Sequence, residues 1–146
     1  MDIEAVLSKL NKSKFRASFH LKLNDIEYIK EKGWDTIQTH CQDFIQKRLA
    51  PAIISNDGKQ TPTKGHPVFA AQHACACCCR GCLNKWHKIK QGINIPNNEI
   101  NEIVKLLMAW MHKEFDSYKE REAIESPNSD KIKKTNKKIP LQLKLF

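Results

Sequence analysis

Cysteine and histidine side chains, which are ligands that transition metals favour, are concentrated between residues 73 and 87. Five of the six cysteines lie in the run 75–82. The central unit is Cys79-Arg80-Gly81-Cys82, because a C-x-x-C turn lets two thiolates converge on one cation while backbone amides donate to the sulfurs. His87 follows five residues after Cys82, and Cys78 precedes the turn directly. We therefore predict a zinc site whose ligands are Cys78, Cys79, Cys82 and His87.

Other interpretations of this cluster stay open. Cysteines on an alanine-rich helix often act as small apolar fillers, and histidines beside them are then satisfied by hydrogen bonds. An iron–sulfur cluster is the less favoured cofactor, since the cysteine spacing matches no familiar ligation pattern. A redox dithiol at Cys79 and Cys82 would normally follow a strand, and none is predicted here. The alternative fourth zinc ligands, brought in by folding, are His73, His66 and Cys41.

A long run of turn-forming residues, 55–67, precedes the cluster. Loops of about 12 residues inside compact domains are often functional rather than idle. With the helix that follows, the loop offers Asp57, His66 and His73 as candidate catalytic residues of a metal-dependent nuclease, in which a histidine near the metal would activate water. Against this alternative, the chain shows no pair of metal-binding carboxylates and no nuclease signature. A plain surface loop is the other interpretation.

The elements that must position these residues are predicted to be helices. Apolar residues recur at helical spacing in 2–10, 25–32 and 34–49, in a segment opening at Pro67, in 83–89, and from Asn97 or Asn98 to Phe115. Residues 15–23 alternate apolar and polar, which predicts a half-buried extended segment. The predicted fold is mainly α: a small single helical domain with a zinc-stabilised Cys/His turn and a disordered basic C-terminal tail.

The charge of the chain favours a polyanionic partner. Lys and Arg total 25 against 16 Asp and Glu, which gives +9, so DNA is the leading candidate. The lysines predicted to contact it lie in the tail: Lys131, Lys133, Lys134, Lys137 and Lys138. No apolar stretch reaches 18 residues and the amino terminus lacks a signal-like core, so we expect a cytoplasmic protein with no membrane partner.

The last residues of the chain carry a second motif. Gln142-Leu143-Lys144-Leu145-Phe146 resembles the short peptide with which many bacterial DNA polymerases and repair proteins dock on the sliding clamp. The resemblance implies that Gln142 hydrogen-bonds at the rim of a groove on the clamp, and that Leu143, Leu145 and Phe146 fill it. The implied organisation is a helical Cys/His-cluster domain at 1–125, a flexible basic linker at 126–140 and a clamp-binding peptide at 141–146. A plug that folds back on the core is the alternative for these residues.

A wider resemblance covers about residues 15–112. The segments that carry it are 56–62, 65–69, 71–74, 78–83 and 85–87, which include Gly65-His66-Pro67-Val68-Phe69 and Cys78-Cys79-Arg80-Gly81-Cys82-Leu83. Together they look like an uncharacterised family of small bacterial and phage proteins known only as a domain of unknown function. The resemblance implies that the loop at 55–67 and the cysteine cluster form one site, and it implies no activity.

The function expected from these features is that of an accessory protein of DNA replication or repair. Its C-terminal peptide would recruit it to the bacterial sliding clamp, and its core would bind a metal and associate with nucleic acid. Two alternatives remain: a metal-dependent nuclease or other DNA-processing enzyme, and a non-enzymatic clamp blocker from a mobile element. The sequence alone leaves open whether the core is catalytic, which nucleic-acid structure it prefers and its oligomeric state.

Overall fold

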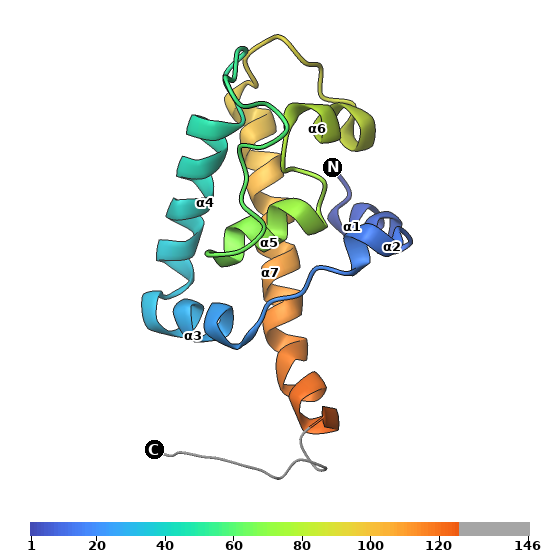
Figure 1. Cartoon of the computed structure of the whole chain (residues 1–146), viewed down its shortest axis with the longest axis vertical. Helices are drawn as coiled ribbons and strands as arrows, with labels where there is room; N and C mark the ends of the chain where they lie inside the picture. Colours follow the sequence, from blue (N-terminus) through green and yellow to red (C-terminus); the bar gives the residue numbers. More distant parts are fainter. Residues whose placement is uncertain (126–146) are drawn as a thin grey trace. The chain divides into compact units, whose positions relative to one another are not determined.

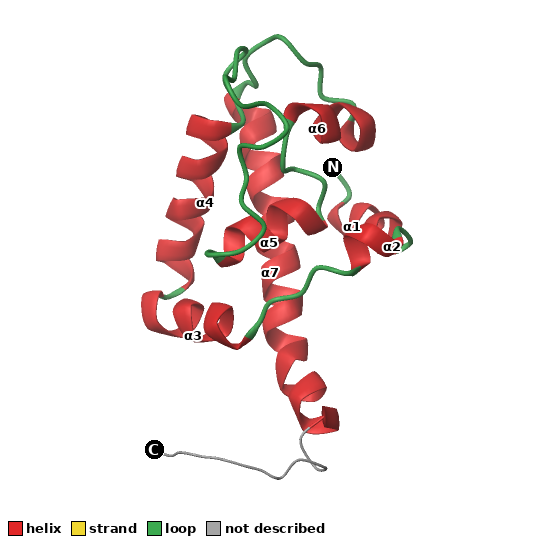
Figure 2. Cartoon of the chain, viewed as in Figure 1, coloured by secondary structure: helices red, strands yellow, loops and turns green. Residues whose placement is uncertain are grey.

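The computed structural model describes residues 1–125, and the side chains of residues 1–118. This part of the chain contains seven helices and no strand (Figure 2), which confirms the prediction of a mainly α fold. The helices are α1 (Ile3–Asn11), α2 (Lys14–Ala17), α3 (Leu23–Lys32), α4 (Trp34–Arg48), α5 (Pro67–Ala74), α6 (Arg80–His87) and α7 (Asn97–Glu125). Residues Met1–Glu114 form one compact unit. None of the described helices is long and apolar enough to cross a membrane.

Two of the predicted segments fall outside the described residues. These are the basic linker at 126–140 with its lysines Lys131, Lys133, Lys134, Lys137 and Lys138, and the clamp-binding peptide at 141–146 with Gln142, Leu143, Leu145 and Phe146. Both therefore stay predictions.

Local signals explain where the helices begin and end. The Asp2 carboxylate accepts a hydrogen bond from the Ala5 amide at 3.3 Å and so caps the start of α1. Gly33, with φ of 85°, separates α3 from α4, a conformation that glycine adopts without the penalty of a side chain. Pro67 is the first residue of α5, where its fixed φ suits a helix and its missing N–H has no cost.

The predicted extended segment at 15–23 is wrong at both of its ends, while residues 19–22 between them lie in no helix. Its first residues form the short helix α2, which the Ser13 hydroxyl caps by accepting from the Arg16 amide at 3.2 Å. Its last residue, Leu23, opens α3. The alternating apolar side chains do not share a buried face, since Phe15 is 59% exposed whereas Leu21 is buried. Local capping thus prevailed over the period-two pattern.

Helix α5 packs against α2, α3 and α4 (Figure 1). Its small side chains, including the buried Ala71 and Ala74, allow these neighbours to approach closely. The part of α7 that lies within residues 1–114 contributes the fully buried Leu106, Leu107 and Met111 to the same core. Because α5 leads directly into the cysteine run, its packing fixes the start of that run.

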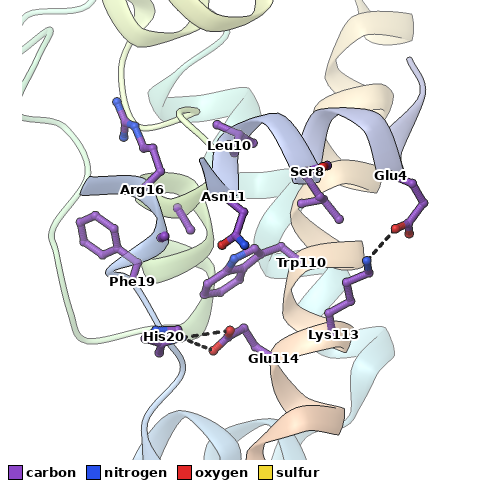
Figure 3. Close-up of a pocket in the computed structure, with 13 residues that line it drawn as sticks. Glu4, Ser8, Leu10, Asn11, Arg16, Phe19, His20, Trp110, Lys113 and Glu114 are labelled. Atoms are coloured by element: carbon purple, nitrogen blue, oxygen red, sulfur yellow. Dashed lines mark hydrogen bonds and ion pairs between the residues drawn. The ribbon is translucent and has the colours of Figure 1, made fainter. Parts of the chain in front are cut away.

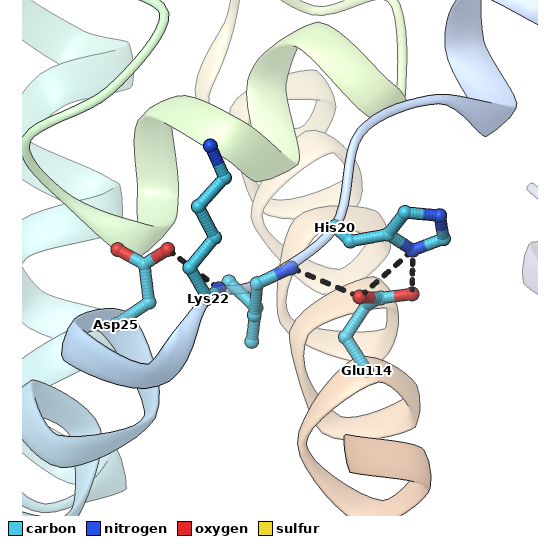
Figure 4. A network of polar contacts seen from close by, with 5 residues as sticks. His20, Lys22, Asp25 and Glu114 are labelled. Carbon is cyan, nitrogen blue, oxygen red and sulfur yellow. Dashed lines mark hydrogen bonds and ion pairs between the residues drawn. The ribbon is translucent and has the colours of Figure 1, made fainter. Parts of the chain in front are cut away.

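The link between α2 and α3 is tied to α7 by one carboxylate. Glu114 accepts a hydrogen bond from the Leu21 amide at 2.9 Å and contacts the His20 ring at 3.1 Å (Figure 4). The next amide, that of Lys22, donates to the Asp25 carboxylate at 3.0 Å and so starts α3. These bonds satisfy successive amides of a segment that has no strand partner.

Candidate metal centre

Three cysteine sulfurs converge where α5 gives way to α6. The Sγ atoms of Cys78, Cys79 and Cys82 all lie within 4.8 Å of one another, and no other metal-ligand group of three or more occurs among the described residues. In a tetrahedral zinc–thiolate site the sulfurs lie about 3.8 Å apart, given Zn–S bonds of about 2.3 Å. The three thiols are therefore close enough to hold one soft cation after small side-chain adjustments.

The backbone between the two helices explains this convergence. After α5, the chain reverses at Ala76, which adopts a left-handed φ of 58° and is fully buried. The Cys77 amide then donates back to the Gln72 carbonyl at 2.8 Å. Cys79 is the N-cap of α6, and its sulfur accepts a hydrogen bond from the Cys82 amide at 3.4 Å. The amide-to-sulfur bond expected of a C-x-x-C turn is thus present.

Arg16, from α2, contacts two of the three sulfurs. Its guanidinium donates to Cys82 Sγ at 3.2 Å and to Cys78 Sγ at 3.8 Å, and it also donates to the His73 carbonyl at 2.6 Å. Burial acts to lower the pKa of Arg16, but the hydrogen bonds to Cys82 and Cys78 more than offset it and the pKa is raised. Arg16 therefore places a buried cation beside two of the three sulfurs.

The other three cysteines are buried in the apolar core. Cys41, Cys75 and Cys77 are fully buried, and burial raises the pKa of Cys41 to about 12. Burial raises the pKa of Cys75 and Cys77 as well. These thiols stay neutral at physiological pH and act as small apolar side chains. The interpretation as apolar fillers therefore fits these three cysteines. The other three are the converging cysteines that could hold a metal ion.

The structure places His87 outside the three-sulfur group. Its Nε2 donates to the Cys75 carbonyl at 2.7 Å and lies 3.8 Å from Cys77 Sγ. The alternative ligand His73 is also engaged, since its Nε2 lies 3.1 Å from the carbonyls of both Thr61 and Pro62. The assignment of His87 as the fourth ligand stays a prediction.

The loop at 55–67 covers the cluster. The Thr61 hydroxyl donates to the Cys78 carbonyl at 2.8 Å, and the Asp57 carboxylate accepts from the Arg80 amide at 3.2 Å. Asp57 therefore lies at the start of α6, where the helix dipole favours a negative charge. The loop and the cysteine cluster form one continuous unit.

His66 lies in a different environment from the other two candidate catalytic residues. Its Nδ1 accepts from the Val68 amide at 3.1 Å, so the neutral ring carries its proton on Nε2 and donates to His40 Nδ1 at 3.0 Å. The rings of Tyr28 and Phe44 pack against it with centroids 5.1 Å away. Burial, together with the His40 ring, lowers the pKa of His66 to about 4. No described contact joins Asp57, His66 or His73 to one another.

Arg80 is a residue that the sequence analysis missed. It lies inside the C-x-x-C turn but points away from the sulfurs, and its buried guanidinium donates to five backbone carbonyls. These belong to Leu49, Ala50, Pro51, Lys90 and Ile93, at distances between 2.7 and 3.4 Å. Arg80 thereby joins the end of α4 to the segment after α6. No sequence signal distinguished it from a surface arginine.

A cavity of about 280 Å³ lies beside Arg16 and is lined by residues of α1, α2 and α7 (Figure 3). Charged side chains at its rim pair with each other, as Lys113 does with Glu4 at 2.6 Å and His20 with Glu114 at 3.1 Å. Figure 3 shows the Trp110 ring and the Asn11 amide between these pairs. The cavity therefore offers an aromatic wall and few free charges.

No solved structure matches the chain. One family model does, over residues 4–112, which include the three-cysteine cluster and the loop at 55–67. The chain therefore belongs to the family described as Domain of unknown function (DUF4186).

Proposed function

We propose that this protein is an accessory factor of DNA replication or repair, recruited to the bacterial sliding clamp by its C-terminal peptide. The observation that carries the proposal is the sequence of residues 142–146, whose glutamine, leucines and phenylalanine match the clamp-docking pattern. The net charge of +9 supports a DNA-associated role. A docking peptide raises the local concentration of the attached domain at the clamp without fixing its orientation.

The metal proposed for the three-cysteine cluster is zinc. Thiolates are soft ligands that select zinc or iron–sulfur clusters over hard cations, and the cysteine spacing lacks the pattern of an iron–sulfur site. Cys78, Cys79 and Cys82 would supply three of the four ligands of a tetrahedral ion. The ion would then fix the turn between α5 and α6. Elemental analysis of the purified protein tests this assignment, and one zinc per chain is the expected result.

The recruitment proposal is tested by titrating the clamp with the full chain and with a chain that lacks residues 142–146. We expect the truncation to abolish binding. Phe146→Ala should weaken it strongly, because the phenylalanine would fill the apolar groove, whereas Lys144→Ala is the matched control at the variable position of the motif. Equal binding by the full and truncated chains would refute recruitment by this peptide.

A further inference from the structure

Two long segments of the chain contain no acidic residue. Neither 5–24 nor 58–98 includes an aspartate or a glutamate. These segments form most of α1, all of α2, and all of α5 and α6, and α2 packs against both α1 and α5. The corner between α1 and α2 carries Lys9, Lys12 and Lys14, all exposed, and none of the three forms an ion pair with a described residue. This corner therefore presents an uncompensated positive charge to solvent.

Two aromatic rings lie on this same surface, and both contact one guanidinium. The central carbon of the Arg16 guanidinium is 5.0 Å from the centroid of the Phe15 ring and 5.9 Å from that of the Trp86 ring. Lys9 Nζ also lies 5.9 Å from the Trp86 ring, which joins α6 to α1. Phe15 is 59% exposed, so its ring is open to solvent beside these charges. We call Lys9, Lys12, Lys14, Phe15 and Trp86 the α1–α2 face.

We propose that the α1–α2 face binds single-stranded DNA. The proposal rests on the DNA association inferred above and names the nucleic-acid structure that the folded domain takes. Single strands expose unstacked bases, which stack on aromatic side chains while lysines contact the phosphates. In a duplex the bases stack on each other, so Phe15 would add nothing and only the lysines would contribute. Stacking is tolerant of sequence, so the face selects strand structure rather than a base sequence.

The cysteine cluster positions this face. Arg16 contacts both rings and is held by the His73 carbonyl and by the Cys82 sulfur. Phe15 also packs edge-on against Phe19, with ring centroids 5.2 Å apart, and Phe19 in turn stacks on His73. The ring of Phe15 is therefore fixed from below while its outer side is open. A rigid ring of this kind loses little entropy when a base stacks on it.

The test measures the affinity of the full chain for a labelled 20-nucleotide dT strand by fluorescence anisotropy. Replacing Phe15 by Ala or by Leu should weaken binding about tenfold, because both remove the aromatic surface, whereas Phe15→Tyr should retain it. Ile53→Ala is the matched control, since Ile53 is 90% exposed and lies outside the face. Circular dichroism checks that each variant keeps the helical content of the wild type.

A second pair of variants tests the lysines. Lys12→Glu combined with Lys14→Glu should weaken dT binding and reduce the magnitude of the slope of log K against log salt by about 1.4, as expected for the loss of two phosphate contacts on a single strand. Lys30→Glu combined with Lys47→Glu makes the same charge change on α3 and α4, where both lysines are exposed, and should have a much smaller effect. The C-terminal lysines are intact in all of these chains, so their contribution cancels.

Three outcomes would overturn the proposal. They are no measurable binding of the dT strand, equal affinity of the Phe15→Ala and Ile53→Ala chains for it, and tighter binding of a 20-nucleotide rU strand, which would assign the face to RNA. A duplex of the same length should bind equally well to the wild type and to Phe15→Ala. A chain without residues 142–146 should bind the dT strand as the full chain does, so the failure of clamp recruitment and the failure of this site are distinguishable.

Discussion

The Arg16 guanidinium donates to the sulfur of Cys82 across 3.2 Å and so joins α2 to α6 over 66 positions of the sequence. The same side chain reaches Cys78 and the carbonyl of His73, the residue before the last of α5. A single side chain therefore attaches the first two helices to the turn that presents the three converging sulfurs. This contact therefore joins the three-cysteine cluster to the N-terminal helices.

Replacing a converging cysteine should remove the metal, whereas replacing a buried filler cysteine should not. We expect Cys79→Ala and Cys82→Ala each to lower zinc to a small fraction of one ion per chain, because two thiolates hold zinc far more weakly than three. Cys41→Ala is the control, since Cys41 lies outside the three-sulfur group. Inductively coupled plasma mass spectrometry gives the metal content. Full zinc occupancy in Cys82→Ala would rule out the site. Loss of zinc from the His87→Ala chain would identify His87 as the fourth ligand.

Arg16→Lys should destabilise the protein even though it keeps the positive charge. A lysine ammonium cannot reach the His73 carbonyl and both sulfurs with the geometry of a planar guanidinium. We expect the free energy of unfolding to fall by about 2 kcal/mol, the usual cost of breaking a buried polar network. Urea denaturation measures it. Lys47→Arg, at an exposed lysine of α4, should change it by less than about 0.5 kcal/mol.

Arg80→Lys should have a larger effect than Arg16→Lys. The two terminal nitrogens of Arg80 serve separate groups of carbonyls, one at the end of α4 and one at Lys90 and Ile93. A single ammonium can serve only one of these groups, so the other loses its donors. The expected decrease in the free energy of unfolding is about 3 kcal/mol. A decrease no larger than that of the Lys47→Arg control would show that water replaces these bonds without cost.

His66 should make the protein less stable in mild acid. Its pKa is lowered by burial and by the His40 ring to about 4 in the folded chain, while an unfolded histidine titrates near about 6.5. Below pH 6.5 the unfolded chain therefore binds a proton that the folded chain does not, and stability falls until the pH reaches about 4. Urea denaturation at pH 7.5 and pH 5 measures this decrease.

His66→Asn is the matched variant for the pH experiment. Asparagine can still cap α5 through the Val68 amide but does not titrate. The variant should lose less stability between pH 7.5 and pH 5 than the wild type. Burial also lowers the pKa of His87, so the free energy of unfolding of the variant should still fall somewhat between pH 7.5 and pH 5. An equal loss of stability between pH 7.5 and pH 5 in the variant and the wild type would show that His66 does not contribute to the pH dependence.

The sequence predicted most helices because their signals are local. Asp2, Gly33 and Pro67 mark helix ends through bonds or backbone angles within a few residues. It failed at residues 15–23, where an alternating pattern suggested an extended segment and the Ser13 cap produced the helix α2 instead. The alternating pattern and the Ser13 cap are both local signals, so the sequence alone did not decide between them. The folded structure shows that Phe15 is exposed.

The three converging cysteines were also predictable, since they lie within five consecutive positions. Their partners were not. Arg16 and Arg80 act through contacts with residues far along the chain, and nothing in their neighbours distinguishes them from surface arginines. The same holds for His66, whose pKa is lowered by burial and by the ring of His40 from α4. Long-range contacts of this kind follow from the packing of α5, which composition and periodicity do not encode.

The five carbonyl contacts of Arg80 also bear on how the domain opens. The end of α4, the first turn of α6 and residues 90–93 share one side chain, so none of them can detach while the other two stay in place. Their amides should therefore exchange with deuterium as a single cooperative unit rather than fraying separately. A surface loop next to such a unit gains the protection of the core although its own backbone bonds are few.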